Sequence, residues 1–474
     1  LYNPRAAFYT MPLALLAIGS HLDPARYRVV IVDGRLEDDP VTALAAHLDR
    51  AVCLGVTVLT GRPIRDALAV SRALKARRPD LPVVWGGWHP SMFGTECLTE
   101  PTVDATVQGQ GEATFTAIVE ALADAPRGSH PGAALDGLTG TAIRRADGSV
   151  HRHAPRPIED INTFRQHDYN LLPVERYFDL KGQRQLDYIS SQGCPFRCAF
   201  CADPFVYQRK WFGLSAERVG DEITDLWDRY RFDDLAFQDE TFFTYPKRID
   251  AIARAFIDAN LPISWSGTLR ADQCERMKDD VFERCVASGM RRVLIGVESG
   301  DPAMLVRIRK DITLEQIFAA AARCRDHGVA TIFPFIVGFP DETERGVQMS
   351  MDVAKELRAL AGPGADVQTP FFFFKPYPGS PLTHAAVAAG HKLPTTLEGW
   401  ADFEFTDSAG PWVSETVRDR IERFTFYLRL AFARPRPWLT PLQRAARWRL
   451  DRDRYDLPVE RWVGRRLRPD PVLT

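Results

Sequence analysis

The sequence shows no excess of one charge and no long apolar run. Its 60 basic and 62 acidic side chains give a formal net charge of −2, so no overall field indicates nucleic acid as a partner. The longest apolar runs, Met11–Ile18 and Ala330–Val337, are well short of the ~20 residues that a bilayer-spanning helix needs. The first residues do not resemble a secretory leader. We therefore expect a soluble, cytoplasmic protein that does not bind nucleic acid.

Cysteine is scarce, with eight residues in a chain of 474. Five are single and far apart, which is typical of small buried hydrophobic residues in a reducing compartment. The other three lie in one short stretch. A disulfide framework would distribute its cysteines along the chain, so this stretch predicts a metal site. The clustered cysteines are Cys194, Cys198 and Cys201, and the single ones are Cys53, Cys97, Cys274, Cys285 and Cys324.

Residues 1–125 alternate short apolar runs with segments of helical length. Together with a composition of 45% hydrophobic and 26% charged residues, this pattern predicts a globular, doubly wound α/β domain with a parallel sheet. Glycines gather after the expected strands, at the sheet edge where such folds bind ligands. The expected strands are Tyr27–Val32, Ala51–Leu59, Leu81–Trp85 and Val103–Val107, and the expected helices are Leu13–Leu22, Pro40–Leu48, Pro63–Arg77 and Ala113–Ala123.

Three further regions follow. Residues 126–183 are rich in turn-forming residues and predict a linker with a small hairpin. Residues 184–392 predict a partial (β/α)₆ barrel, and residues 393–474 a helical, arginine-rich C-terminal region. The expected barrel strands are Leu186–Ser190, Asp234–Gln238, Ile263–Thr268, Arg292–Val297, Thr331–Val337 and Val367–Phe374. The helices expected between them are Ala216–Tyr230, Pro246–Ala259, Gln273–Ser288, Leu314–His327 and Glu342–Leu360.

The clustered cysteines follow directly on the first expected barrel strand. Three thiolates in one loop can hold three irons of a 4Fe–4S cluster and leave the fourth iron open to an external ligand. A structural zinc site would need a fourth Cys or His nearby, and the next cysteine, Cys274, lies in a different part of the chain. The spacing therefore favours an iron–sulfur cluster, with zinc as the alternative.

The C-x3-C-x2-C motif, with Phe200 before its last cysteine, resembles that of the radical S-adenosylmethionine (SAM) enzymes, and the resemblance covers about residues 186–390. It implies that the three cysteines hold a 4Fe–4S cluster whose free iron binds SAM, and that reductive cleavage of SAM yields a 5′-deoxyadenosyl radical. Each matching segment at the end of a strand could alone be a helix cap. The SAM contacts that the resemblance implies are Phe200, Gln238, Asp239, Glu240, Arg270, Glu298, Ser299 and Gly338.

The first domain lacks a G-x-G-x-x-G fingerprint after its first expected strand, which argues against a nicotinamide dinucleotide. Its glycine-bearing segments resemble the cobalamin-binding domain that is fused to one branch of the radical SAM enzymes. No histidine lies in a D-x-H-x-x-G motif, so that motif does not supply a lower ligand of cobalt. A purely structural domain is the alternative. The cobalamin contacts that the resemblance implies are Thr57, Val58, Thr60, Gly61, Gly86, Gly87, His89, Gly109, Gln110, Gly111 and Glu112.

The fusion of the two domains implies a cobalamin-dependent radical SAM enzyme, and we expect a C-methyltransferase that acts on an unactivated carbon. The alternative is an oxidative cyclase or rearrangement enzyme of the anaerobic magnesium-protoporphyrin monomethyl ester cyclase type. A methylthiotransferase is disfavoured because the first domain has no second cysteine trio. A non-catalytic cobalamin or redox sensor would not need the open iron and the SAM segments. The family also implies an electron donor such as flavodoxin or ferredoxin.

The C-terminal region offers the only hint about the substrate. Arg434–Arg468 contains eleven arginines and four acids, with Trp438, Trp448 and Trp462 between them. Such a segment could rest on an anionic membrane, which would suit a lipid or tetrapyrrole as well as another small-molecule substrate. The alternative is a helical cap whose tryptophans pack on the barrel.

Overall fold

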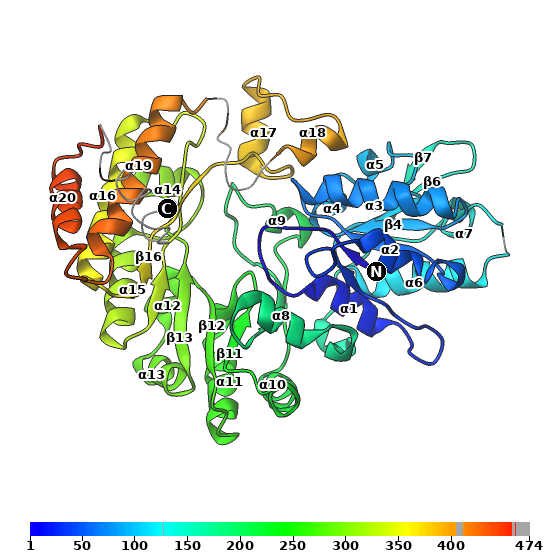
Figure 1. Ribbon diagram of the computed structural model, residues 1–474, viewed down its shortest axis with the longest axis horizontal. Helices are drawn as coiled ribbons and strands as arrows, with labels where there is room; N and C mark the ends of the chain where they lie inside the picture. The colour runs from blue at the N-terminus through cyan, green and yellow to red at the C-terminus, as the bar shows by residue number, and fades with distance from the viewer. Residues whose placement is uncertain (127, 404–409, 411, 457–459, 461–474) are drawn as a thin grey trace.

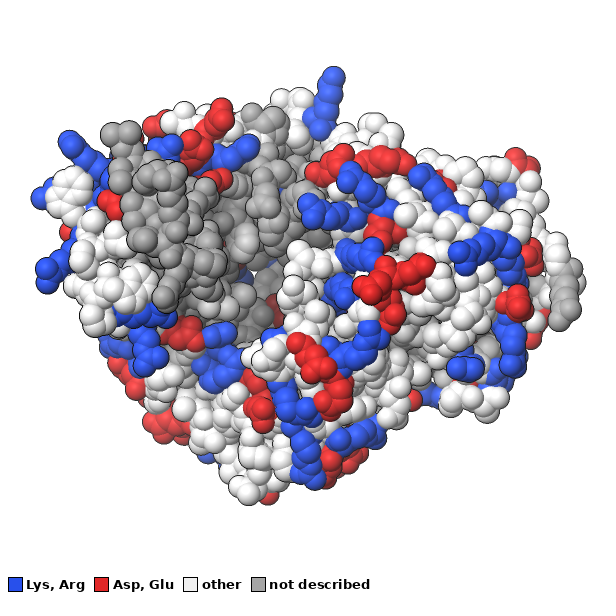
Figure 2. Space-filling model, viewed as in Figure 1, with Lys and Arg blue, Asp and Glu red and all other residues white. Residues whose placement is uncertain are grey.

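The computed structural model describes residues 1–126, 128–403, 410, 412–456 and 460. Two sheets lie next to each other, each flanked by helices, and the chain completes the first before it begins the second (Figure 1). On the face shown in Figure 2, basic and acidic side chains are interspersed over the surface that is coloured, in keeping with the balanced charge. No helix of the described residues is long and apolar enough to cross a membrane.

The first sheet has seven strands in the order β2-β1-β3-β4-β5-β6-β7, and its first five strands are parallel. The expected doubly wound α/β domain is confirmed. The strands are β1 Tyr2–Asn3, β2 Val32–Asp33, β3 Leu54–Thr57, β4 Val83–Gly86, β5 Ala105–Val107, β6 Thr141–Arg144 and β7 Val150–Arg152. The helices around them are α1 Leu13–His21, α2 Pro40–Ala45, α3 Pro63–Arg77, α4 Trp88–Met92, α5 Gly94–Cys97, α6 Glu112–Asp124 and α7 Pro131–Ala134.

Several features of this sheet differ from expectation. The expected strand Tyr27–Val32 is a strand only at Val32, where β2 begins. The two residues of β1 were not predicted, because so short a run carries no pattern, yet Tyr2 is fully buried between β2 and β3. The expected hairpin is present as β6 and β7, but β6 pairs antiparallel with β5. The hairpin therefore extends the first sheet, and the predicted domain boundary at residue 125 does not coincide with a boundary of the sheet.

The second sheet has six parallel strands in the order β16-β14-β13-β12-β11-β8, as a partial (β/α)₆ barrel requires. Its last two expected strands are each interrupted, and their second halves form the parallel pair β15–β17. The strands are β8 Gln185–Tyr188, β11 Asp234–Phe237, β12 Ser264–Leu269, β13 Met290–Ile295, β14 Ala330–Ile332, β15 Phe335–Val337, β16 Val367–Gln368 and β17 Phe371–Phe373. The main barrel helices are α8 Val174–Lys181, α10 Ala216–Tyr230, α11 Pro246–Asp258, α12 Ala271–Arg276, α13 Asp279–Ala287, α14 Pro302–Arg307, α15 Leu314–Asp326 and α16 Glu344–Ala361.

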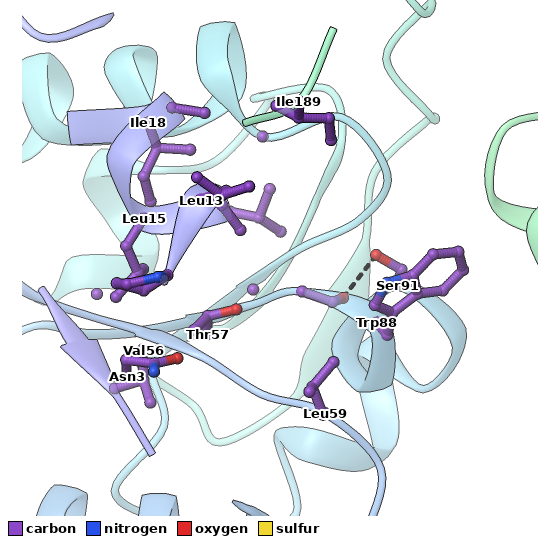
Figure 3. A pocket seen from close by; sticks show the side chains of 18 of the residues that line it. Asn3, Leu13, Leu15, Ile18, Val56, Thr57, Leu59, Trp88, Ser91 and Ile189 are labelled. Atoms are coloured by element: carbon purple, nitrogen blue, oxygen red, sulfur yellow. Dashed lines mark hydrogen bonds between the residues drawn. The ribbon is translucent and has the colours of Figure 1, made fainter. Parts of the chain in front are cut away.

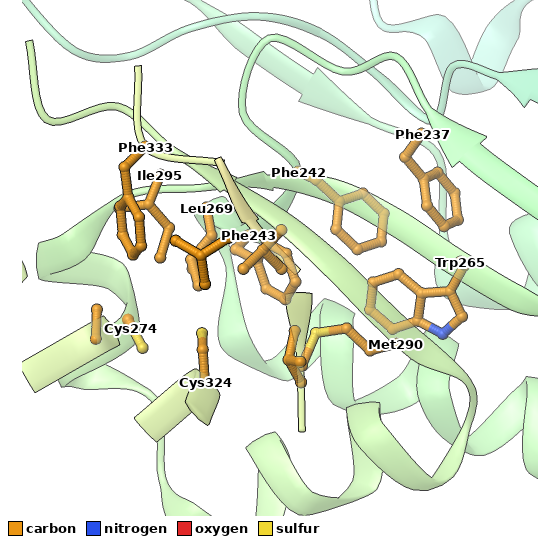
Figure 4. Close-up of a cluster of buried hydrophobic side chains, with 14 of the residues drawn as sticks. Phe237, Phe242, Phe243, Trp265, Leu269, Cys274, Met290, Ile295, Cys324 and Phe333 are labelled. Atoms are coloured by element: carbon orange, nitrogen blue, oxygen red, sulfur yellow. The ribbon is translucent and has the colours of Figure 1, made fainter. Parts of the chain in front are cut away.

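Aromatic and aliphatic side chains fill the space between this sheet and its helices (Figure 4). Phe237 from β11 stacks on Phe242, with ring centroids 4.1 Å apart, and Trp265 from β12 meets Phe242 edge to face. Cys274 and Cys324 are buried in the same core. These two single cysteines behave as the small hydrophobic residues that we expected.

One expected barrel helix is wrong. Residues 273–288 form two helices, α12 and α13, because Met277 and Lys278 have extended backbones. Met277 is buried, and Asp279 and Asp280 occupy the first turn of α13. Acidic residues are favoured at a helix N-terminus by the helix dipole. The apolar periodicity continued across this break and concealed it.

The residues after the barrel form helices in both halves of the molecule. They are α17 Pro381–Ala388, α18 Leu397–Ala401, α19 Glu415–Phe432 and α20 Thr440–Asp451. Helix α18 packs on α3 of the first domain and adds Trp400 to that domain's core, whereas α19 packs on α16 of the barrel. Trp438 and Trp448 are 51% and 46% exposed, so neither is packed into the barrel core. Trp462 lies outside the described residues.

Candidate functional site

The loop with the clustered cysteines begins after β9 (Ser191–Gly193), at the carboxyl edge of the barrel sheet. Gly193 has φ +83°, and a Cβ on it would lie 2.3 Å from the carbonyl oxygen of Lys210, so only glycine fits there. Beyond this turn, the amide of Ala199 donates to the carbonyl oxygen of Ile308 at 2.8 Å. The loop is thus fixed at its start and near its end.

The three clustered thiols are partly buried in this loop. Burial raises the pKa of Cys194 to about 12 and the pKa of Cys201 well above its usual value, and each of these groups interacts electrostatically with Cys198. Among the described residues, no group of three His, Cys, Asp or Glu side chains could hold a single metal ion. A 4Fe–4S cluster takes one thiolate on each of three irons, and this loop offers three free cysteines. The donor set therefore fits a cluster.

Arg270 connects the cysteine loop to the rest of the edge. Its Nη1 lies 3.8 Å from Sγ of Cys198, and its guanidinium stacks over the ring of Phe196 at 3.7 Å. Its Nη2 donates to the carbonyl oxygen of Lys310 at 2.7 Å. The predicted SAM residue Arg270 is therefore positioned next to a predicted cluster ligand.

Three predicted SAM residues follow β11, and they have different surroundings. Asp239 is 3% exposed and accepts hydrogen bonds from the backbone and hydroxyl of Ser190 and from the hydroxyl of Ser191. It therefore braces the strand that leads to the cysteines, and burial raises its pKa. The neighbouring side chains of Gln238 and Glu240 line a cavity instead. Burial raises the pKa of Glu240 well above its usual value, and its Oε2 has no hydrogen-bond partner in the part of the chain that the structure describes.

The other predicted SAM residues lie at the ends of β13 and β15. Glu298 forms a buried ion pair with Lys310, and the hydroxyl of Ser299 accepts from the amide of Asp301 at 3.1 Å. Gly338, at φ +76°, accepts a hydrogen bond from the indole of Trp412. Phe200 packs edge to face on Phe339, with centroids 6.2 Å apart.

A cavity of about 340 Å³ joins the carboxyl edges of the two sheets. Figure 3 shows Leu13, Leu15 and Ile18 of α1 on one side of it, Thr57 in the middle, and Trp88 and Ser91 at the other end. From the barrel, the cavity is lined by Ile189, Gln192, Val206, Tyr207, Gln238 and Glu240. The cavity is therefore shared by both domains.

The predicted cobalamin residues divide into two groups. Seven of them line the shared cavity: Thr57, Gly86, Gly87, Gly109, Gln110, Gly111 and Glu112. The other four, Val58, Thr60, Gly61 and His89, are not among its lining residues. His89 is fully buried against Phe93 and Trp400, and its Nδ1 lies 3.1 Å from Oγ1 of Thr60. Burial lowers the pKa of His89 to about 3, so the ring is neutral there.

The lining of this cavity leaves the main chain of the first sheet accessible to a ligand. Val84 and Val107 of the sheet and Leu13 and Ala17 of α1 belong to that lining. Among the described residues, the nearest neighbour of a Cβ added at Gly86 is Val107 at 3.7 Å, so the cavity is open there. Small residues at strand ends allow a ligand to approach the backbone. The residues present therefore fit cobalamin.

A hydrogen-bonded chain crosses from the first domain to the strand before the cysteines. Gln192 donates to Oε1 of Glu112 at 2.7 Å and accepts from Gln110 at 2.9 Å. Glu112 is 5% exposed, and burial raises its pKa. Two residues predicted to contact cobalamin are thus also the side chains that attach the first domain to β9.

Sequence reasoning missed several residues at this edge. Trp88 and Ser91 lie next to the predicted His89, and Ser91 accepts from the amide of Gly109 at 3.0 Å. Their position directly after two glycines could have identified them. Gln192 and Lys310 belong to no motif that we recognised. Tyr207, which meets Trp88 edge to face across the domains, had no sequence signal.

Residues 3–119 match the B12 binding domain, and residues 188–354 match the Radical SAM superfamily. Both matches fall on the sheets described above. They span most of the strands and glycine segments on which the resemblance rested, including all three clustered cysteines.

Among curated proteins, an uncharacterised methyltransferase of Pyrococcus horikoshii is 29% identical over 428 residues, which is 88% of this chain and 88% of that protein. The anaerobic magnesium-protoporphyrin IX monomethyl ester cyclase of Synechocystis is 28% identical over 341 residues, 70% of this chain and 66% of the cyclase.

Solved structures share the fold. The radical S-adenosylmethionine methyltransferase TsrM of Kitasatospora setae, with tryptophan and a SAM analogue bound, superposes with a TM-score of 0.67 at 19% identity, over 82% of this chain and 76% of TsrM. The cobalamin-dependent enzyme OxsB, with aqua-cobalamin and SAM bound, superposes with a TM-score of 0.63 at 19% identity, over 82% and 55% of the two chains. The chain therefore carries a B12-binding domain over residues 3–119, followed by a radical SAM domain over residues 188–354.

Proposed function

We propose that this protein is a cobalamin-dependent radical SAM C-methyltransferase that acts on an unactivated carbon of a small-molecule, lipid or tetrapyrrole substrate. The observation that supports it most directly is the shared cavity, whose lining comes from the glycine-bearing edge of the first sheet and from Gln238 and Glu240 of the barrel. When bound, SAM and the cluster supply the radical chemistry and cobalamin supplies a methyl group.

The side chains of this protein would bind and orient the ligands in the cavity and exclude water from it. Gln238 is oriented by Asp187, whose Oδ1 accepts from its amide at 2.9 Å. Oδ2 of Asp187 accepts from the amide of Met11 in the first domain at 2.8 Å and pairs with Lys181. Asp187 is 1% exposed and thus links the barrel strand to the first domain from within the core. Trp88 and Tyr207 close the space between the domains at the same edge.

The test measures both products of SAM. A methyltransferase of this kind consumes two SAM molecules per turnover, and we expect S-adenosylhomocysteine and 5′-deoxyadenosine near one to one. A deuterated SAM methyl group should appear in the product. Anaerobically reconstituted enzyme with hydroxocobalamin and candidate substrates provides the assay. If the product forms together with 5′-deoxyadenosine, but carries no deuterated methyl group and is accompanied by no S-adenosylhomocysteine, methyl transfer is rejected.

An oxidative cyclase is the second candidate, since the Synechocystis cyclase is 28% identical over 341 residues. It should yield deoxyadenosine with little S-adenosylhomocysteine. The same assay therefore separates the two functions. Either reaction needs a low-potential electron donor, and we propose a reduced flavodoxin or ferredoxin. In the test, the reduced donor protein replaces the chemical reductant in the assay and should support product formation.

We also propose that the C-terminal helices contact an anionic membrane. Trp448 is exposed on α20, and the guanidinium of Arg452 lies 5.1 Å from its ring centroid. Arg444 is one turn away on the same face of the helix. Exposed tryptophan with flanking arginines suits the interface of an anionic bilayer.

Sedimentation with vesicles tests this contact. Wild-type protein should bind phosphatidylglycerol vesicles, should not bind phosphatidylcholine vesicles, and should be released by high salt. The double variant Trp438→Ala/Trp448→Ala should lose binding. Tyr245→Ala, which removes a 53% exposed aromatic residue from the barrel, is the matched control. Equal binding by both variants would reject the contact.

A further inference from the structure

Lys310 is a buried lysine close to the predicted SAM residues. Its side chain is 8% exposed, and Nζ donates to Oε1 of Glu298 at 2.7 Å. The Glu298 side chain is 10% exposed. A charge removed from water to this extent is costly unless an opposite charge and hydrogen bonds compensate it. Each of the two side chains therefore depends on the other for its burial.

The end of β13 is shaped around this ion pair. A Cβ on Gly296 would lie 2.3 Å from Oε1 of Glu298 and 2.7 Å from Nζ of Lys310. The backbone of Glu298 has φ +64°, its amide donates to the carbonyl oxygen of Pro334, and its own carbonyl oxygen accepts from Ile336 at 2.8 Å. Glycine thus leaves room for the pair, and β-type hydrogen bonds fix the main chain beneath it.

The turn that carries Lys310 is also attached to the cysteine loop. Ile308 accepts from the amide of Ala199 at 2.8 Å, and Asp311 pairs with Arg197 at 2.8 Å. The carbonyl oxygen of Lys310 accepts from Arg270, the residue that stands beside Cys198. The main chain of Lys310 is therefore held to the loop that would carry the cluster, and its side chain is held to Glu298.

We propose that Lys310 is a positioning residue, which orients the Glu298 carboxylate to accept hydrogen bonds from the ribose hydroxyls of SAM. A carboxylate can accept several donors, so the bond from Lys310 leaves capacity for hydroxyl donors. Because the same turn is bonded to the cysteine loop, Lys310 also sets the distance between this carboxylate and that loop. This inference rests on the proposed function insofar as that function requires SAM.

The test is a double-mutant cycle on SAM affinity, measured by equilibrium dialysis with cluster-reconstituted protein. Lys310→Met should weaken SAM binding by about tenfold or more, the scale of one lost hydrogen bond to a charged group. Lys310→Arg should recover most of the affinity. In a Glu298→Gln background, Lys310→Met should change the affinity by less than about twofold, because the carboxylate that it orients is gone.

Matched measurements separate positioning from damage to the fold. Cluster content and hydroxocobalamin binding should be the same in all variants. Lys355→Met is the control, since Lys355 pairs with Asp352 and Asp453 on α16 and the C-terminal segment, away from the carboxyl edge. If Lys310→Met alone does not fold, the neutral and polar substitution Lys310→Gln takes its place in both backgrounds of the cycle.

Two results would overturn the inference: unchanged SAM affinity in Lys310→Met, or an equal loss in both backgrounds, which would indicate a structural role only. The proposed function fails in a different way. If the variants give the expected double-mutant cycle but the wild-type protein forms no methylated product and no S-adenosylhomocysteine with any substrate, the assignment as a methyltransferase is wrong. The role of Lys310 then still stands. Absence of SAM binding by the wild type would reject both.

Discussion

Gly86 provides the sharpest steric probe of the shared cavity. It ends β4, lines the cavity, and does not have a positive φ, so a side chain there does not strain the backbone. An added Cβ would meet only Val107, at the ordinary contact distance of 3.7 Å. Gly87 is a poorer choice because its φ is +95° and a Cβ would lie 2.9 Å from Oγ1 of Thr57. Any effect at Gly86 therefore reports on the space in the cavity.

We expect Gly86→Leu to weaken corrinoid binding. Leucine adds four heavy atoms beyond the main chain of glycine, and they would project into a cavity of about 340 Å³. Overfilling a packed site by this amount costs about 1–3 kcal/mol, which is a loss of roughly 5- to 150-fold in affinity. Gly86→Ala adds only the tolerated Cβ and should bind nearly as the wild type does.

The assay is titration with hydroxocobalamin followed by gel filtration and visible absorbance. Cluster content and SAM affinity, measured on the same samples, should stay unchanged in both variants because Gly86 lies in the first sheet. Corrinoid binding by Gly86→Leu at wild-type affinity would refute the placement of cobalamin in this cavity. Equal loss in Gly86→Ala would refute the steric argument, since that variant leaves the space open.

Three other changes have defined outcomes. The variant in which Cys194, Cys198 and Cys201 are all replaced by alanine should hold no 4Fe–4S cluster by iron analysis and should not cleave SAM. Glu342→Gln should flatten the pH dependence of the apoprotein's thermal unfolding. Burial raises the pKa of Glu342 to about 7, above its unfolded value. In the wild type, the stabilising contribution of this residue is therefore lost as the pH rises from about 5 to 7. Trp400→Ala should destabilise the first domain by about 3–5 kcal/mol in urea unfolding, because Trp400 is 3% exposed, whereas Trp438→Ala should have little effect.

The barrel was well predicted because each signal in its sequence is local. The helix Ala216–Tyr230 was predicted to the residue, since Ser215 caps it and its apolar residues recur at helical spacing. The strand beginning at Asp234 was predicted with its correct start. Strand order followed as well, because parallel strands joined by helical crossovers usually pair in sequence order.

Contacts between distant segments were not predictable in the same way. The sequences of β6 and β7 do not indicate that this hairpin joins the first sheet, because the residue pattern of an antiparallel edge strand does not identify the strand with which it pairs. The return of α18 to the first domain likewise depends on Trp400 meeting Phe93, more than 300 residues earlier in the chain. Motif reasoning found Glu298 but not Lys310, because the partner of a buried carboxylate has no fixed spacing.

The same long-range contacts determine how the two sheets face each other. Asp33, at the end of β2, accepts a hydrogen bond from the hydroxyl of Tyr177 in α8 and pairs with Arg35, which lines the cavity. Burial opposes a charge on Asp33, but the bonds to Arg35 and Tyr177 outweigh it and lower its pKa. With Met11 held by Asp187 and Glu112 by Gln192, polar contacts attach the two domains at several points around one cavity. These contacts place the lining residues of both domains around one cavity, as a site that must hold its ligands in a defined geometry requires.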